Sequence, residues 1–153
     1  AILEHGRILQ IGTPQEIYRR PISRTVAHFM GETNFLPAQV LAVVGLRLTL
    51  ATAIGNFEGL WSDSTPAPVV GASVTISIRP EVWELRALEA SHNCVSGHIG
   101  DSVYLGEIAQ HEFITDGGLT LKISERNPRF TEGTNRPKLY ATVDPADVVV
   151  LVD

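Results

Sequence analysis

Alternating apolar and polar residues mark the chain from about residue 34 onward. In residues 46–50, 74–78 and 119–123 every second side chain is apolar. A period of two is typical of antiparallel strands with one buried face. Many such short strands, separated by turn residues, predict a mainly β fold of the barrel or sandwich type.

Two stretches rich in turn-forming residues interrupt this pattern. Residues 55–71 contain several Gly, Ser, Asp and Pro residues, and residues 127–137 are polar. Because proline removes a backbone donor and breaks strand ladders, we expect both to be mostly loop. The first should hold one short strand near Leu60 and Trp61.

The start of the chain has a different pattern. Residues 2–12 read as two short strands around a His-Gly turn. Thr13 and Glu16 then form a capping box, in which each side chain accepts from the backbone N–H of the other, and Pro14 occupies the first helical position. This predicts a helix that ends near Arg20, because the residue after it is a proline.

A second short helix is predicted over residues 24–30, capped by Ser23 and stopped by Gly31. Helices below about 12–15 residues are marginal in water on their own. We therefore expect both helices to pack on the β region or on a second copy of the chain.

A faint internal repeat runs through the β region. Residues 34–40 align with 93–99, and residues 78–82 align with 143–148. This favours two similar five-stranded β units, interleaved or packed together.

Composition narrows the possible functions. The chain has 153 residues, of which 44% are hydrophobic and 19% charged, with a net charge of −5. A packed core is therefore expected, and an acidic, weakly charged surface does not suit the phosphate backbone of nucleic acids. No apolar run is long enough to span a bilayer, and Cys94 alone allows no intrachain disulfide. Trp61 and Trp83 are expected to anchor the core or an interface.

Motifs for catalysis or metal binding are missing from the sequence. It has no G-x-x-x-x-G-K-[ST] phosphate loop, no H-E-x-x-H and no G-x-S-x-G, and its five histidines show no zinc spacing. His111 and Glu112 are adjacent on a predicted strand, so their side chains point to opposite faces. We expect no catalytic, cofactor or metal site in this chain.

Charged residues gather where two strands end at prolines. Glu81 and Glu84, and likewise Asp144 and Asp147, are best explained as solvated turn residues. Arg79, at the end of an apolar strand, suits a structural role in which its planar fork binds a carboxylate or backbone carbonyls.

Together these motifs resemble the ATP-binding subunits of ABC importers. Residues 4–21 and 25–36 closely resemble the end of their nucleotide-binding domain, and Gly-Glu-Thr-Asn-Phe-Leu at 31–36 looks most like spermidine/putrescine-type members. The remainder resembles their transport-associated OB-like (TOBE) domain. Its motif positions are Arg79, Pro80 and Glu81, Leu105 and Gly106, and Asp144 and Pro145.

The resemblance implies a division at residue 31: residues 1–31 as the tail of a nucleotide-binding domain, and 32–153 as an OB-like accessory domain. The chain would then be a fragment, with the catalytic motifs, ATP and Mg in the full-length parent. The accessory domain would be regulatory and would pair with a second copy. The parent would meet membrane permeases on the inner face of the bacterial plasma membrane without inserting into it.

Two other functions remain open from the sequence. Related domains bind molybdate or other oxyanions, and the repeated contexts of Asn34 and Asn93 resemble that pattern loosely, with residues 91–93 the closest fragment. An oligonucleotide-binding OB domain is disfavoured by the net charge and the few aromatic residues.

Overall fold

The computed structural model describes residues 1–61, 66–129 and 137–152. The first part contains two strands and two helices: β1 (Ile2–Glu4), β2 (Arg7–Gln10), α1 (Pro14–Arg19) and α2 (Arg24–Phe29). The first half of the β region contains β3 (Asn34–Val44), β4 (Arg47–Thr52), β5 (Gly55–Leu60), β6 (Ser73–Ile78), the 3-10 turn η1 (Pro80–Val82) and β7 (Glu84–Arg86). The second half contains β8 (Cys94–Leu105), β9 (Ile108–Thr115), β10 (Thr120–Arg126), β11 (Leu139–Thr142), the 3-10 turn η2 (Pro145–Asp147) and β12 (Val149–Leu151).

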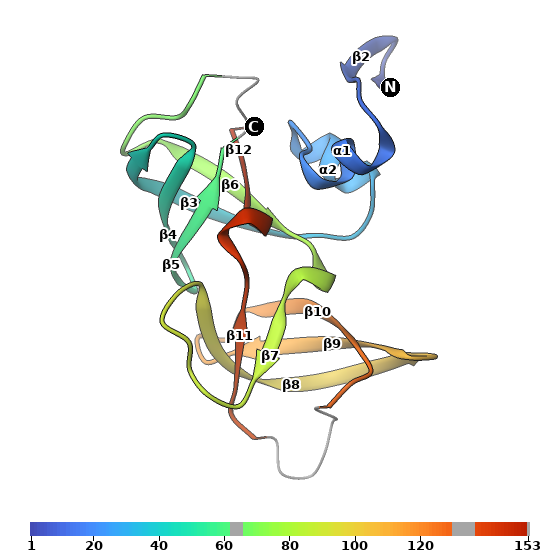
Figure 1. The fold of residues 1–153 in the computed structure, drawn as a ribbon, viewed down its shortest axis with the longest axis vertical. Helices are drawn as coiled ribbons and strands as arrows, with labels where there is room; N and C mark the ends of the chain where they lie inside the picture. Colours follow the sequence, from blue (N-terminus) through green and yellow to red (C-terminus); the bar gives the residue numbers. More distant parts are fainter. Residues whose placement is uncertain (62–65, 130–136, 153) are drawn as a thin grey trace.

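The two halves repeat the same order of elements and exchange their last strands (Figure 1). A closed five-stranded barrel has the order β12-β5-β4-β3-β6, and a five-stranded sheet has the order β10-β9-β8-β11-β7. Thus β7, from the first half, pairs with β11 in the sheet, and β12, from the second half, closes the barrel between β6 and β5. The predicted mainly β, OB-like fold of two similar five-stranded units is confirmed, and of the two arrangements left open by the sequence, interleaved or packed together, the structure shows the interleaved one.

The long first strand of each unit carries an irregularity. The β3–β4 register shifts between Val40 and Ala42, and the β8–β9 register shifts between Ile99 and Ser102. Bulges of this kind bend and twist a strand more strongly. These shifts therefore allow β3 and β8 to bend along their length.

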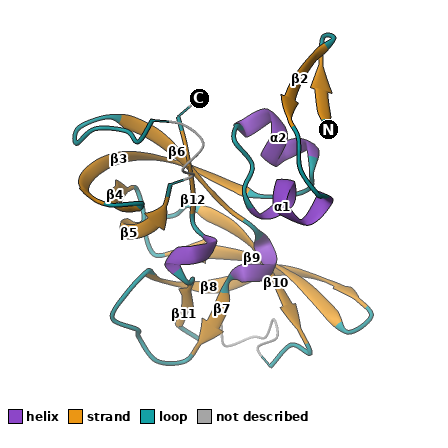
Figure 2. Cartoon of the chain, turned by 45° about the horizontal axis from the view of Figure 1, so that its top comes forward, coloured by secondary structure: helices purple, strands orange, loops and turns teal. Residues whose placement is uncertain are grey.

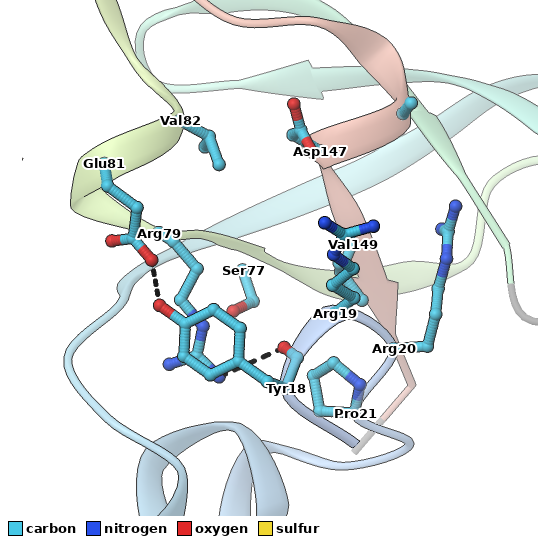
Figure 3. A pocket seen from close by; sticks show the side chains of 11 residues that line it. Tyr18, Arg19, Arg20, Pro21, Ser77, Arg79, Glu81, Val82, Asp147 and Val149 are labelled. Carbon is cyan, nitrogen blue, oxygen red and sulfur yellow. Dashed lines mark hydrogen bonds between the residues drawn. The ribbon is translucent and has the colours of Figure 1, made fainter. Parts of the chain in front are cut away.

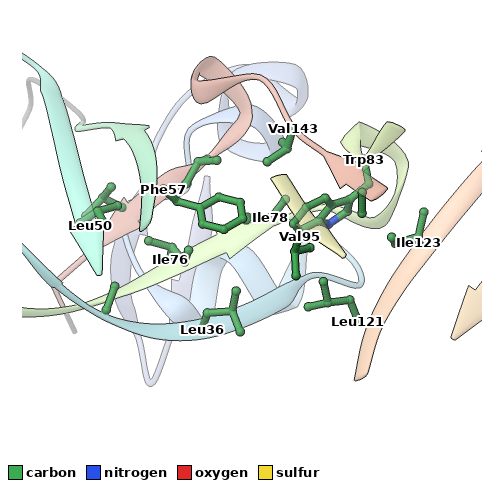
Figure 4. Packing of buried hydrophobic residues seen from close by; sticks show 14 of the residues in the cluster. Leu36, Leu50, Phe57, Ile76, Ile78, Trp83, Val95, Leu121, Ile123 and Val143 are labelled. Carbon is green, nitrogen blue, oxygen red and sulfur yellow. The ribbon is translucent and has the colours of Figure 1, made fainter. Parts of the chain in front are cut away.

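One hydrophobic cluster joins both units (Figure 4). Trp83, in the connection between η1 and β7, is 5% exposed, and its ring meets that of Phe57 edge-on at a centroid distance of 6.2 Å. Trp61 is also buried, so both tryptophans are core residues as predicted. Because the cluster is shared, neither unit has a complete core without the other.

One predicted loop is wrong in its first half. Residues 55–60 form β5, paired with β4 along its whole length, whereas residues 66–69 are free of regular structure as expected. Gly59, one of the glycines that suggested a loop, lies close to the neighbouring chain in the barrel, since a Cβ there would be 3.0 Å from Val148 Cγ1. The remainder of that loop, 62–65, and most of the second predicted loop, 130–136, lie outside the described residues.

Both predicted helices are present, and they lie against the β units (Figure 2). The capping box of Thr13 and Glu16 is formed, and Ser23 caps α2 through the N–H of Val26. Ile17, on α1, and Val26, on α2, are buried. The β1–β2 hairpin stands apart from the β units in both views. Within the described ranges, no helix has the length and apolar character needed to cross a membrane.

Candidate functional site

A junction between the helices and the β units centres on Arg79 (Figure 3). This residue follows β6, precedes η1 and is only 7% exposed. Its Nη1 donates to the carbonyl oxygens of Gly31 at 2.9 Å and Glu32 at 3.1 Å, and its Nη2 lies 3.5 Å from the carbonyl oxygen of Tyr18. The predicted structural role for Arg79 is therefore seen in the geometry, with backbone carbonyls as the partners.

The ring of Tyr18 completes this contact. The guanidinium carbon of Arg79 lies 4.3 Å from the ring centroid, and the Tyr18 hydroxyl donates to the carboxylate of Glu81 on η1. Burial lowers the pKa of Arg79, but a guanidinium remains charged in proteins. A partly desolvated cation over an aromatic face is worth up to about 2 kcal/mol, so the junction holds α1 firmly to η1.

The linker after α2 is tied to both units. The Glu32 carboxylate accepts from Lys122 Nζ at 3.1 Å and from Gln110 Nε2 at 2.8 Å, both in the sheet. Thr33 Oγ1 lies 2.7 Å from Ser77 Oγ in the barrel. The hydrogen bond and charge of Lys122 lower the pKa of Glu32, with a smaller contribution from the other side-chain donor. The linker between α2 and β3 is thus fixed in place by side chains on strands of both units.

A cavity of about 360 Å³ opens beside this junction, between the end of α1 and the two 3-10 turns. Arg19 and Arg20 approach it from α1, and Asp147 approaches it from η2 (Figure 3). Burial, followed by the charge of Asp144, raises the pKa of Asp147, while the charges of the two arginines act in the opposite direction. Charges of both signs therefore meet around one small space.

The structure brings some of the predicted motif positions together and not others. Arg79, Pro80 and Glu81 lie at the junction, and Asp144 and Pro145 begin η2 on the other side of the cavity. Asp144 caps this turn, since its Oδ1 accepts from Ala146 N–H at 2.8 Å. The other two motif positions, Leu105 and Gly106, lie away from the cavity at the tip of the β8–β9 hairpin. Leu105 is 61% exposed, and Gly106 has a φ of +69°.

Asn34 and Asn93, compared in the sequence as repeat positions, are equivalent clamps between the units. Asn34 donates to the Lys122 carbonyl at 2.8 Å and accepts from the Lys122 N–H at 2.8 Å. Asn93 makes the same pair with Glu58, at 2.9 and 2.7 Å. Asn34 is the first residue of β3, and Asn93 directly precedes β8, so both lie at the start of the first strand of a unit. Each side chain hydrogen-bonds to the third strand of the other unit. Both side-chain amides are thus engaged with backbone and are not directed at an anion site.

A buried polar row in the sheet was missed by the sequence analysis. His111 has a fully buried side chain, with Nδ1 2.7 Å from Ser102 Oγ and Nε2 3.1 Å from Glu125 Oε1. As expected, Glu112 is exposed on the other face and is not its partner. The sequence did hold one signal for the burial of His111: it is two residues from both Ala109 and Phe113, so it lies on the same buried face of the strand. In the described residues, no three His, Cys, Asp or Glu side chains are placed to hold a metal ion.

Comparison with known proteins gives several relatives that share one description. The spermidine/putrescine import ATP-binding protein PotA of Pseudomonas fluorescens is 34% identical over 150 residues, which is 92% of this chain and 38% of that protein. PotA of Ruegeria pomeroyi is 35% identical over 133 residues, covering 86% and 34%. PotA 1 of Pseudomonas aeruginosa is 37% identical over 155 residues, covering 100% and 39%. The chain therefore spans less than two fifths of the length of these relatives. No protein-family model matches it.

A solved structure supports the fold. The cytoplasmic molybdate-binding protein ModG, in a crystal form with molybdate bound, superposes with a TM-score of 0.67 at 12% sequence identity. The match covers 78% of this chain and 96% of ModG. At this identity the likeness concerns the fold alone. The sequence matches run through both the helical segment and the β units, and the chain is a homologue of one part of the spermidine/putrescine import ATP-binding proteins, the ATP-binding subunits of ABC importers.

Proposed function

We propose that this chain is a non-catalytic regulatory and dimerisation module of the ATP-binding subunit of an ABC importer for polyamines or a related small solute. Residues 1–31 serve as the tail of the nucleotide-binding domain, and residues 32–153 as the accessory domain. ATP and Mg bind elsewhere in the full-length subunit. The relatives support this assignment through matches to one part of their length.

The observation that carries the proposal is the Arg79 junction. A passive linker would leave the helices free to move relative to the β units. Here the guanidinium is buried, bonds to carbonyls of the helical segment and stacks on Tyr18. Glu32 adds a tie to the sheet. A movement of the helical segment would therefore move the accessory domain with it, which is the property a regulatory module needs.

Pairing with a second copy is supported by exposed apolar side chains at two hairpin tips. The β3–β4 tip exposes Val44 and Leu46, and the β8–β9 tip exposes Tyr104 and Leu105. Exposed apolar side chains that lie together often mark protein–protein interaction sites. Light scattering during size exclusion, over a dilution series, tests the pairing: a dimer supports it, and a monomer at every concentration contradicts it for this chain.

The proposed place of the whole subunit follows from its relatives. It would work in the cytoplasm, against permease subunits on the inner face of the bacterial plasma membrane. Contact with the permeases would come through the nucleotide-binding domain, and the accessory domain would insert in no membrane and bind no nucleic acid.

A chimaera tests the proposed function. The matched 150 residues of the P. fluorescens relative would be replaced by this chain, and ATP hydrolysis and spermidine uptake measured in membranes with the cognate permeases. We expect the chimaera to be active and its Arg79→Ala version to lose most uptake. Arg86→Ala, an exposed arginine on β7, is the matched control and should retain uptake. Equal uptake by both variants would contradict the role of the junction.

A further inference from the structure

We propose that the cavity between α1 and η2 binds a small zwitterion of the α-amino acid class, with its carboxylate on Arg19 and Arg20 and its ammonium on Asp147. The cavity shares Tyr18, Arg79 and Glu81 with the Arg79 junction, but the charged side chains proposed to hold the ligand are others. Nothing in the comparisons assigns a ligand to it.

Three charged side chains of the cavity, those of Arg19, Arg20 and Asp147, are not joined to one another. The other two, on Arg79 and Glu81, are engaged in the junction. Arg19 and Arg20 are consecutive at the end of α1, and in the described part of the chain neither side chain has a hydrogen bond or an ion pair. The same holds for the Asp147 carboxylate, whose turn is capped by Asp144 instead. The opposite charges nevertheless sense each other, since both arginines oppose the rise in the pKa of Asp147. Because all three side chains line one cavity of about 360 Å³ without forming an ion pair, one small molecule in it can contact both signs of charge.

The other lining residues set the size and shape of the ligand. Pro21, Val82 and Val149 provide apolar wall, and Tyr18 with Arg79 forms a wall held by the contacts of the junction. A volume of about 360 Å³ lies at the lower end of the range for small-molecule sites. This suits a free amino acid with a small or medium apolar side chain better than a nucleotide or a peptide.

The charge pattern decides between ligand classes. A guanidinium binds a carboxylate through paired, charge-assisted hydrogen bonds. An anion without a cationic group would meet the Asp147 carboxylate, and a diamine such as putrescine would meet two guanidiniums. Of the charged groups in the lining, Arg79 and Glu81 are already engaged in the junction. A ligand with both charges close together can pair with Asp147 and with the two remaining arginines at once. When bound, it would join α1 to η2, in addition to the Arg79 contact that joins α1 to η1. The regulatory effect of this second tie rests on the proposed function, but the binding itself does not.

Calorimetry and thermal melting of this chain test the site with matched probes. Glycine, L-alanine and L-leucine are the zwitterions. The probes 4-methylpentanoate and 3-methylbutylamine are leucine without its ammonium and without its carboxylate. A ligand that binds only the folded state raises the melting temperature. We expect at least one amino acid to bind, and both single-charge probes to bind about tenfold weaker or worse than L-leucine.

Variants assign the binding to these groups. Asp147→Asn and Arg19→Gln should each weaken amino acid binding by about tenfold or more, with the ligand-free melting temperature as a check on folding. Asp101→Asn, an exposed aspartate on β8, is the matched control and should bind normally. The proposal is overturned if no amino acid binds, if 3-methylbutylamine or putrescine binds as well as L-leucine, or if Asp147→Asn binds like the control. The uptake chimaera reports on the junction independently of these results.

Discussion

Replacing the two clamping asparagines one at a time should destabilise the chain unequally. Asn93 is 4% exposed and lies at φ +44°, in the left-handed region. Its side chain satisfies both the N–H and the C=O of Glu58. Asn34 makes the equivalent pair with Lys122 near solvent, at a φ that is not positive, and its Nδ2 also donates to the Ile78 carbonyl at 3.1 Å. Removing the Asn34 amide lets water replace it at the exposed Lys122 backbone, whereas removing the Asn93 amide leaves backbone groups of Glu58 poorly solvated.

The magnitudes follow from these environments. Each hydrogen bond contributes about 0.5–1.5 kcal/mol net, and a buried group left unsatisfied costs about 1–3 kcal/mol. Asn93→Ala should therefore cost roughly 2–4 kcal/mol through the clamp and about 1–2 kcal/mol more because alanine disfavours a left-handed backbone. Asn34→Ala removes three hydrogen bonds of ordinary net strength, without the backbone penalty, and should cost about 1.5–3 kcal/mol.

Glycine variants separate the energy of the side-chain hydrogen bonds from the energy of the backbone conformation. At position 93 glycine has no penalty for a positive φ, so Asn93→Gly should be more stable than Asn93→Ala by about 1 kcal/mol. At position 34 the order should reverse, with Gly less stable than Ala by about 0.5–1 kcal/mol.

Urea unfolding of the four variants measures these differences as free energies of unfolding. The reasoning is refuted if Asn93→Ala and Asn34→Ala cost the same, or if Gly is no better than Ala at position 93. A lower m-value in the Asn93 variants would further indicate that the two units have begun to unfold separately.

Two other perturbations follow from the contacts. Lys122 lowers the pKa of Glu32, so this pair contributes stability above the ordinary glutamate pKa, and that stability is lost as the pH falls through the lowered pKa. Between about pH 6 and about pH 3, the melting temperature of Glu32→Gln should therefore fall less steeply than that of the unaltered chain. Identical slopes would contradict this. Gly97→Ala would place a Cβ 2.8 Å from Phe113 Cε1 and against the β9 backbone, so it should cost about 3 kcal/mol or more by chemical unfolding, whereas Gly117→Ala, with nothing within 4 Å, should cost little.

The local pattern of the sequence was sufficient for elements whose cause is local. The Thr13–Glu16 capping box predicts the start of α1, and alternation predicts β4, β6 and β10 to within a few residues. The repeat predicts two similar units. It does not predict the exchange of β7 and β12, because alternation describes the faces of a strand and not its neighbour.

Features that depend on distant neighbours could not be predicted in full. Gly59 suggests a loop when read locally, yet a glycine is needed there because β12 passes close by. The position and chemistry of Arg79 predict binding to a carboxylate or to backbone carbonyls, but its partners lie 47 to 61 residues away in the sequence. His111 likewise pairs with Glu125 on the next strand, and only the strand pairing identifies that partner.

Hydrogen exchange of the helical segment tests most directly whether the Arg79 junction couples the helices to the β units. Exchange of the backbone amides of α1 and α2 would be followed by mass spectrometry in the unaltered chain, Arg79→Ala and Arg86→Ala. If the junction holds the helices, their amides are protected in the unaltered chain and in Arg86→Ala, and Arg79→Ala exchanges them at least about tenfold faster while the barrel amides stay protected. Equal protection of α1 and α2 in all three proteins would contradict the account.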